Sequence, residues 1–239
     1  MMRLKKHTGF FAITAQLLLL SFMVCNMESC TGCEAETKAK STSPTPSKYV
    51  LPFIGEQDFD YDLDGNITDT LFHTVPPFYF TAHDSSIITN ETVKGKIYVA
   101  DFFFTNCPSI CPIMTSNMKV LHENTKDIEE LIILSHTIDP GRDTLARLNT
   151  YIEEKNVDTR DDWFFLYASQ AYTYDIGKHG YKVNADVDEK AEGGFLHSEY
   201  FMLIDREGRI RGAYDGTDPE QVKLLESDIR LLIKKEYGE

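Results

Sequence analysis

The sequence has few cysteines. Only 5 of its 239 residues are cysteine, and three of them, Cys25, Cys30 and Cys33, lie close to the N-terminus. The other two, Cys107 and Cys111, are too few for a small secreted fold that disulfide bonds hold together. This excludes the disulfide-stapled class, so the domain has to be stabilised by a hydrophobic core.

Basic charge is also scarce. The chain has 24 Lys and Arg against 38 Asp and Glu, which gives a formal net charge of −14 at pH 7. A surface of this sign repels nucleic acid and anionic lipid headgroups. We therefore expect no nucleic-acid partner, and the simplest interpretation of the acidity is solubility.

Only one apolar run approaches the length of a membrane span. Basic residues among the first six precede the run 9–24, and Cys25 follows the run directly. This layout is typical of a secretory signal, and a cysteine after such a run resembles a bacterial lipoprotein processing site, at Cys25 or Cys30. A retained anchor is the alternative, although the run falls short of roughly 20 residues. We expect residues 1–33 to be this signal, lipoprotein segment or membrane anchor, which places the rest of the chain in the cell envelope, facing the periplasm.

The segment that follows has a different composition. Residues 34–50 mix charged residues with Ser, Thr and Pro and have almost no large apolar side chains. This predicts a disordered tether. The globular pattern begins at Leu51, so we expect residues 51–239 to form a single domain.

Strands and amphipathic helices alternate in this domain. The continuous apolar runs 97–104 and 131–134 predict strands that are buried on both faces. The other predicted elements are a hairpin of 78–80 and 87–89, helices over 111–121, 144–155 and 169–180, a strand over 163–167, a hairpin of 200–204 and 210–214, and a last helix over 218–235. Asp143 is the predicted N-cap of the helix that follows it.

The order of these elements predicts the fold class. Strands that alternate with helices and end in a hairpin favour an α/β fold with a central mixed sheet flanked by helices. Two cysteines at the point where the first long buried strand meets its helix are a thioredoxin-like arrangement. We expect a thioredoxin-like fold with an N-terminal β-hairpin extension.

Cys107 and Cys111 are the strongest functional signal. Residues i and i+4 share one face of a helix, so two thiols at this spacing could close a disulfide or hold a soft metal ion. A disulfide here would close a very small loop and stabilise little, which disfavours a purely structural bond. The helix N-terminus is expected to lower the pKa of both thiols and so to favour redox chemistry or metal binding.

A third metal ligand has to come from elsewhere in the chain, and His197 is the candidate. It follows two glycines and precedes a predicted strand, and the loop before that strand lies beside the cysteine motif in a thioredoxin-like sheet. His136 ends the strand that begins at Leu131, and it is a candidate for a group that orients the ligands. His122 shares a helix face with Cys111 but lies roughly 16 Å along the axis from it, which is too far.

Three motifs together resemble the Sco/SenC family of copper chaperones. They are Cys-Pro-Ser-Ile-Cys-Pro at 107–112, Asp-Pro-Gly-Arg-Asp-Thr at 139–144, and His197 before the strand near the C-terminus, and the resemblance covers about residues 70–235. It implies that Cys107, Cys111 and His197 bind one copper ion, Cu(I) or Cu(II). It also implies delivery of copper to the CuA centre of cytochrome c oxidase subunit II, or to another copper or thiol client. Ser109 replaces the aspartate most common at its position.

Asp139 and Asp143 belong to the second motif. Soft thiolates select copper over hard cations, so carboxylates are poor candidates for copper ligands. We predict that both aspartates fix the loop near the site.

A thiol-disulfide reductase is the main alternative. In that function Cys107 attacks a disulfide of a partner and Cys111 resolves the mixed disulfide. The reductase would be an enzyme, whereas a metallochaperone is not. His197 discriminates between the two, because only the copper site needs an imidazole. A peroxide-reducing enzyme and an interaction module without chemistry are weaker alternatives.

Overall fold

Two parallel strands form the centre of the fold. β5 (Ile97–Phe103) and β6 (Leu131–Thr137) are buried along their whole length and pair from Ile97↔Leu131 to Phe103↔Thr137. Their continuous apolar sequences suit strands that are covered on both faces. These elements come from a computed structural model, which describes residues 50–183, 186–187, 195–196 and 198–238.

The central pair belongs to a mixed sheet of seven strands. The order is β11-β10-β5-β6-β7-β3-β4, in which β5, β6 and β7 are parallel and the outer strands are antiparallel. The other strands are β3 (Tyr79–Ala82), β4 (Ile87–Thr89), β7 (Trp163–Tyr167), β10 (Tyr200–Ile204) and β11 (Ile210–Asp215). Two short strands, β8 (Asp186–Val187) and β9 (Phe195–Leu196), pair with each other in a separate two-stranded sheet. The predicted mixed sheet is confirmed.

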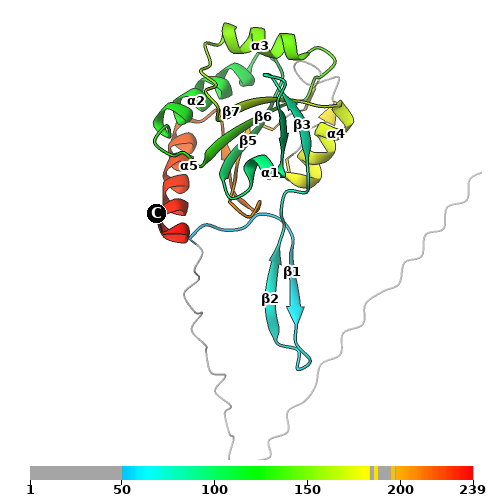
Figure 1. Cartoon of the computed structure of the whole chain (residues 1–239), viewed down its shortest axis with the longest axis vertical. Coiled ribbons are helices and arrows are strands. Elements are labelled where there is room, and N and C mark those ends of the chain that lie inside the picture. The colour runs from blue at the N-terminus through cyan, green and yellow to red at the C-terminus, as the bar shows by residue number, and fades with distance from the viewer. Residues whose placement is uncertain (1–49, 184–185, 188–194, 197, 239) are drawn as a thin grey trace, which may run out of the picture. The chain divides into compact units, whose positions relative to one another are not determined.

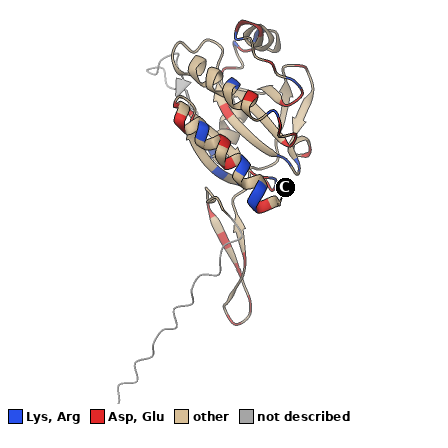
Figure 2. Cartoon of the chain, turned by 90° about the vertical axis from the view of Figure 1, so that its left-hand side faces the viewer, with Lys and Arg blue, Asp and Glu red and all other residues tan. Residues whose placement is uncertain are grey.

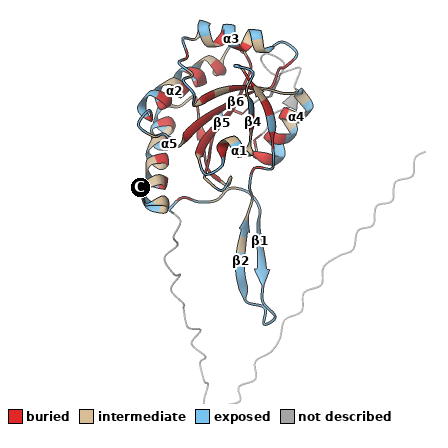
Figure 3. Cartoon of the chain, viewed as in Figure 1, coloured by how far each residue is buried: buried red, intermediate tan, exposed pale blue. Residues whose placement is uncertain are grey.

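Helices cover the two faces of the sheet (Figure 1). They are α1 (Asn90–Val93), α2 (Ile110–Asn124), α3 (Leu145–Glu154), α4 (Gln170–Asp175), α5 (Pro219–Leu232) and the π-helical turns Ile176–Gly180 and Ile233–Tyr237. Phe103 packs on Tyr151 of α3, whereas its neighbour Phe102 packs on Tyr181 after α4. Figure 3 shows that the buried residues lie in the sheet and on the inward sides of the helices.

The start of α3 differs from the prediction. Its N-cap is Thr144, whose backbone is extended and whose Oγ1 accepts a hydrogen bond from Arg147 N. The prediction that Asp143 is the N-cap is wrong. The Asp143 carboxylate instead accepts hydrogen bonds from two threonines of other segments, Thr105 and Thr137. The last helix begins as predicted, with Asp218 as N-cap and Pro219 in the first turn.

The structure contains a hairpin that the sequence analysis missed. β1 (Gln57–Tyr61) and β2 (Ile67–Phe72) pair with each other and form their own two-stranded sheet. The predicted hairpin is confirmed as β3 and β4, but it is part of the main sheet. Aspartate disfavours strands, which is why the segment 57–72 was not recognised.

No described helix is long and apolar enough to cross a membrane. The N-terminal segment with Cys25, Cys30 and Cys33 lies outside the described residues, so the predicted signal, anchor and tether stay predictions.

Candidate functional site

The two cysteines lie at the point where β5 leads into α2. Cys107 follows β5 and its N–H donates to Phe104 O at 3.2 Å, and Cys111 lies in the first turn of α2. The N–H of Cys111 donates to Cys107 Sγ at 3.4 Å. No disulfide joins the two cysteines, and their exposed fractions are 7% for Cys107 and 1% for Cys111. The predicted spacing therefore brings the two sulfur atoms together, with Cys107 nearer to solvent.

The pKa of Cys111 is shifted in the direction opposite to the prediction. Its thiol hydrogen-bonds to Cys107 and is buried, and these two effects raise its pKa well above the usual range. The hydrogen bond stabilises the protonated form of Cys111, which outweighs the expected effect of the helix N-terminus. Metal binding at this pair consequently has to displace the proton of Cys111.

Asp143 holds the loop that carries Cys107. Its carboxylate accepts hydrogen bonds from Thr105 N at 3.0 Å, from Thr105 Oγ1 at 2.5 Å and from Thr137 Oγ1 at 2.5 Å. The Asp143 side chain is fully buried. Arg147 Nε also donates to Thr105 Oγ1, at 3.1 Å. Asp143 thus links the end of β6 to the residue two positions before Cys107, which agrees with the predicted role in fixing the loop.

We expect Asp143→Ala to lower the free energy of unfolding by about 2–3 kcal/mol, because it leaves buried donors without an acceptor. Amide hydrogen exchange in residues 105–111 should become faster than in the parent. Asp218→Ala is the matched control, because it removes the N-cap of α5 at a cost of about 1 kcal/mol and touches nothing near the cysteines. If exchange in residues 105–111 were unchanged in Asp143→Ala, Asp143 would not hold this loop.

Asp139 has a different environment. Its carboxylate accepts a hydrogen bond from Arg142 Nη1 at 3.1 Å, and its N–H donates to Thr137 Oγ1. Burial raises its pKa, against the effect of Arg142. Asp139 therefore braces the same loop, since Asp143 N also donates to Asp139 O at 2.8 Å.

His136 lies on the other face of the sheet. It is fully buried, its ring stacks on Phe102, and its Nδ1 lies 3.2 Å from Asp101 O. Burial lowers its pKa to about 4, so the ring is neutral. Neighbouring residues of a strand point to opposite faces, and Ser135 is the one that faces the α2 side. His136 is therefore not brought to the cysteines.

The predicted third ligand, His197, lies outside the described residues, between β9 and β10. Within the part of the chain that is described, no three His, Cys, Asp or Glu side chains are grouped as a metal site. Two thiols with soft sulfur donors suit copper, although two thiolates alone rarely complete a metal site.

Sequence reasoning missed a polar group beneath the site. Asp101 interrupts the apolar run of β5, and its Oδ1 accepts a hydrogen bond from Ser135 Oγ at 2.6 Å, while Ser135 Oγ accepts one from Trp163 Nε1 at 2.9 Å. The charge of Asp101 acts on Cys111 and contributes to the raised pKa of that thiol. The sequence signal that could have revealed this group is a single carboxylate in a predicted strand of otherwise apolar residues.

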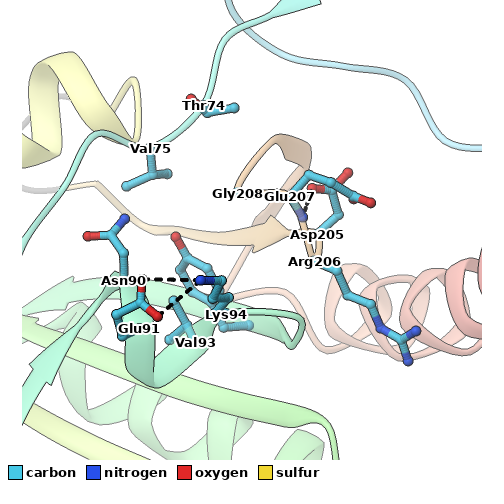
Figure 4. A pocket seen from close by; sticks show the side chains of 11 residues that line it. Thr74, Val75, Asn90, Glu91, Val93, Lys94, Asp205, Arg206, Glu207 and Gly208 are labelled. Carbon is cyan, nitrogen blue, oxygen red and sulfur yellow. Dashed lines mark hydrogen bonds and ion pairs between the residues drawn. The ribbon is translucent and has the colours of Figure 1, made fainter.

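A cavity of about 250 Å³ lies away from the cysteines. Figure 4 shows its lining between α1 and the turn that joins β10 to β11, with the ion pair of Lys94 and Glu91 at 3.2 Å on one side. Tyr98 and Asp205 also line it, and they lie at the end of the sheet where β5 begins. The cavity therefore does not serve Cys107, which follows the other end of β5.

The similarities to known proteins agree with the fold and the motifs. The SCO1/SenC family model matches residues 68–233. The SCO1 protein homolog of Bacillus subtilis (strain 168) is 30% identical over 166 residues, which cover 69% of this chain and 85% of that protein.

Two solved structures are similar as well. The crystal structure of a SCO1/SenC family lipoprotein from Bacillus anthracis str. Ames has a TM-score of 0.61 and 30% identity, with 67% of this chain and 95% of that chain covered. BsSco, a Sco family cytochrome c oxidase assembly protein with a disulfide switch, has a TM-score of 0.58 and 28% identity, with 66% and 92% covered. The predicted thioredoxin-like fold is thereby confirmed.

Proposed function

Because the chain belongs to the SCO1/SenC family, whose members are copper-binding proteins of cytochrome c oxidase assembly, we propose that it is a copper chaperone. Cys107, Cys111 and His197 hold one copper ion in this proposal. The observation that supports it is the pair of adjacent cysteines at the start of α2, where the Cys111 N–H donates to Cys107 Sγ and no disulfide joins them.

The chemistry of the donors supports copper. Two thiolates and one imidazole form a trigonal set that suits Cu(I), whereas zinc needs a fourth ligand. Cys107 is buried, but its neighbours Asn106 and Pro108 are exposed, so the thiol of a client can approach the site, replace one ligand and take the ion. Asp143 and Asp139 keep Cys107 in place during this exchange.

The proposed client is the CuA centre of cytochrome c oxidase subunit II. The chain acts in the cell envelope, with residues 1–33 as signal, lipoprotein segment or membrane anchor, residues 34–50 as tether and residues 51–239 as copper-binding domain. The similarity to a SCO1/SenC lipoprotein supports this location.

Thiol-disulfide reduction is the second candidate function. Cys107 is the more exposed thiol, and Cys111 is buried next to it, as a nucleophile and a resolving thiol require. Attack by Cys107 forms a mixed disulfide and releases one client thiol. Attack by Cys111 then releases the second client thiol and leaves the Cys107–Cys111 disulfide.

Titration of the reduced protein with Cu(I) in the presence of a competing chelator tests the proposal. We expect one copper per chain, and we expect His197→Ala to weaken binding roughly 100-fold, at or beyond the upper end of the 10–100-fold effect of losing a group that only orients a ligand. His179→Ala is the matched control, because His179 is an exposed histidine far from α2 in sequence, and it should bind like the parent.

Weak copper binding that does not change in His197→Ala would contradict the copper site. Reduction of a client disulfide by the same variant at the parent rate would then leave the reductase as the function.

A further inference from the structure

The β1–β2 hairpin lies outside the main sheet and is largely exposed to solvent. All five residues of β1 are exposed, and so are most residues of β2. The hairpin projects from the end of the domain opposite to α3 (Figure 1). A lone two-stranded hairpin is marginally stable in water, so a partner that covers it would contribute to its stability.

The two faces of the hairpin differ in chemistry. Residues that pair directly across the strands share a face, and one face has the pairs Phe59↔Thr70 and Tyr61↔Ile67. Phe59, Tyr61 and Ile67 have exposed fractions of 42%, 60% and 56%. The other face has the pairs Asp58↔Leu71 and Asp60↔Asp69. One face is therefore mainly apolar, whereas the other is mainly acidic and also has the exposed Leu71.

The charge of the hairpin has a single sign. Residues 57–72 contain five aspartates and no Lys or Arg. In Figure 2 the charged residues of the hairpin are all acidic, whereas residues of both signs occur along α5. Asp60 and Asp69 are directly opposed, and such like-charge pairs destabilise a hairpin. A cationic side chain placed beside them would relieve this repulsion.

We infer that the hairpin is a docking element for a partner protein that has a groove with one apolar wall and, opposite it, a wall with Lys or Arg. A ribbon of two strands about 4.8 Å apart is narrow enough to enter such a groove with both faces in contact. A second copy of this chain would bring like charges together, and anionic lipid would repel the aspartates. Charge complementarity thus selects a cationic protein surface.

The base of the hairpin is fixed to the domain. Phe72 stacks on Phe53 with ring centroids 3.7 Å apart, and Lys182 Nζ lies 2.9 Å from Glu56 Oε2. Val75 N donates to Gly208 O in the turn between β10 and β11. A partner on the hairpin is therefore held at a defined place relative to the sheet.

This place is remote from the cysteines. The β10–β11 turn lies beside the start of β5, because Ile204 pairs with Tyr98, whereas Cys107 follows the end of β5. Docking through the hairpin leaves the surface around Cys107 uncovered. The inference does not depend on copper, and copper binding serves as its control.

A photo-crosslinking residue at Tyr61 of the full chain, in cells of the source organism, tests the inference. A crosslinked protein is identified, purified and titrated against the parent chain and its variants. We expect Phe59→Ser/Tyr61→Ser and Asp58→Asn/Asp60→Asn/Asp69→Asn each to weaken binding about tenfold, and higher salt to weaken binding of the parent. Val120→Ser and Asp161→Asn are matched exposed controls that should bind like the parent.

The Asp→Asn variant separates docking from folding. It removes the repulsion between Asp60 and Asp69, so the hairpin is at least as stable as in the parent, and loss of binding has to come from lost charge contacts. Crosslinks only to a second copy or to lipid, or equal affinity of the hairpin variants and the parent, would overturn the inference. Unchanged copper binding in these variants keeps this test independent of the proposed function.

Discussion

Replacing Arg211 with methionine is expected to lower the free energy of unfolding by about 3–5 kcal/mol, because it removes the buried cation that pairs with Asp205 and Glu236. Arg211 is fully buried, and so is Asp205 beside it. Arg211 Nη1 donates to Asp205 Oδ2 at 3.0 Å, and Nη2 donates to Glu236 Oε1 at 2.6 Å. The side chain of Glu236 is only 4% exposed. Loss of the guanidinium removes the cation that pairs with the Glu236 carboxylate, whereas Asp205 keeps its ion pair with Arg209 Nε at 2.8 Å.

Arg211 also joins distant parts of the chain. Its Nη2 donates to Leu51 O at 2.7 Å and its Nε donates to Pro52 O at 3.0 Å, so the start of the domain is tied to β11. Glu236 belongs to the last helical turn and accepts a hydrogen bond from Val50 N at 2.8 Å. The methionine variant therefore loses contacts that hold both ends of the domain together.

The sign of the pH dependence follows from Glu236. Burial alone would raise its pKa, but the hydrogen bonds and charge of Arg211 hold it below the usual value. The stability that this pair contributes is present above the unfolded pKa of Glu236 and is lost as the pH falls through its folded value. In Arg211→Met the pKa of Glu236 should rise, so the difference in stability between parent and variant should shrink in acid.

Denaturant unfolding of the parent and Arg211→Met at pH 7 and at acidic pH measures this effect. Arg230→Met is the control, because Arg230 pairs with Asp127 at the surface, where an ion pair contributes less than about 1 kcal/mol. Adding Glu236→Gln to Arg211→Met should restore part of the loss, since one buried charge is removed. Equal losses in Arg211→Met and Arg230→Met would contradict a buried ion network.

Local signals in the sequence predicted the elements well. The apolar runs of β5 and β6 and the cap formed by Asp218 with Pro219 depend on neighbours in sequence, and the structure confirms them. The hairpin of β1 and β2 also had a local signal, because Phe59 and Tyr61 alternate with aspartates. The low strand propensity of aspartate hid that alternation.

Contacts between distant residues could not be predicted. Asp143 is followed by a helix, so a cap was the expected role, but its partner Thr105 lies 38 residues away and becomes visible only in the structure. The ion pair of Arg211 with Glu236 likewise depends on how β11 and the last helical turn meet. The spacing of Cys107 and Cys111 predicted their proximity, although Cys107 lies in the loop before α2 and only Cys111 lies in the helix.

Replacing Asp101 with asparagine is expected to make the protein more stable at pH 8 by about 4 kcal/mol, and equally stable at about pH 4. Asp101 is only 5% exposed, and burial raises its pKa from 3.8 to about 7. Between these two values the folded protein binds a proton that the unfolded chain releases, so the stability of the parent falls as the pH rises. A shift of one unit corresponds to about 1.4 kcal/mol, which gives the stated difference once Asp101 is ionised.

Asparagine resembles the protonated form of Asp101, so the variant lacks this dependence. Its carbonyl oxygen can still accept the hydrogen bond from Ser135 Oγ, which in turn accepts one from Trp163 Nε1. Denaturant unfolding of both proteins from pH 4 to pH 8 gives the difference in stability at each pH. Asp161→Asn, at an exposed position, should follow the parent throughout. A constant difference between Asp101→Asn and the parent over this range would mean that Asp101 does not take up a proton on folding.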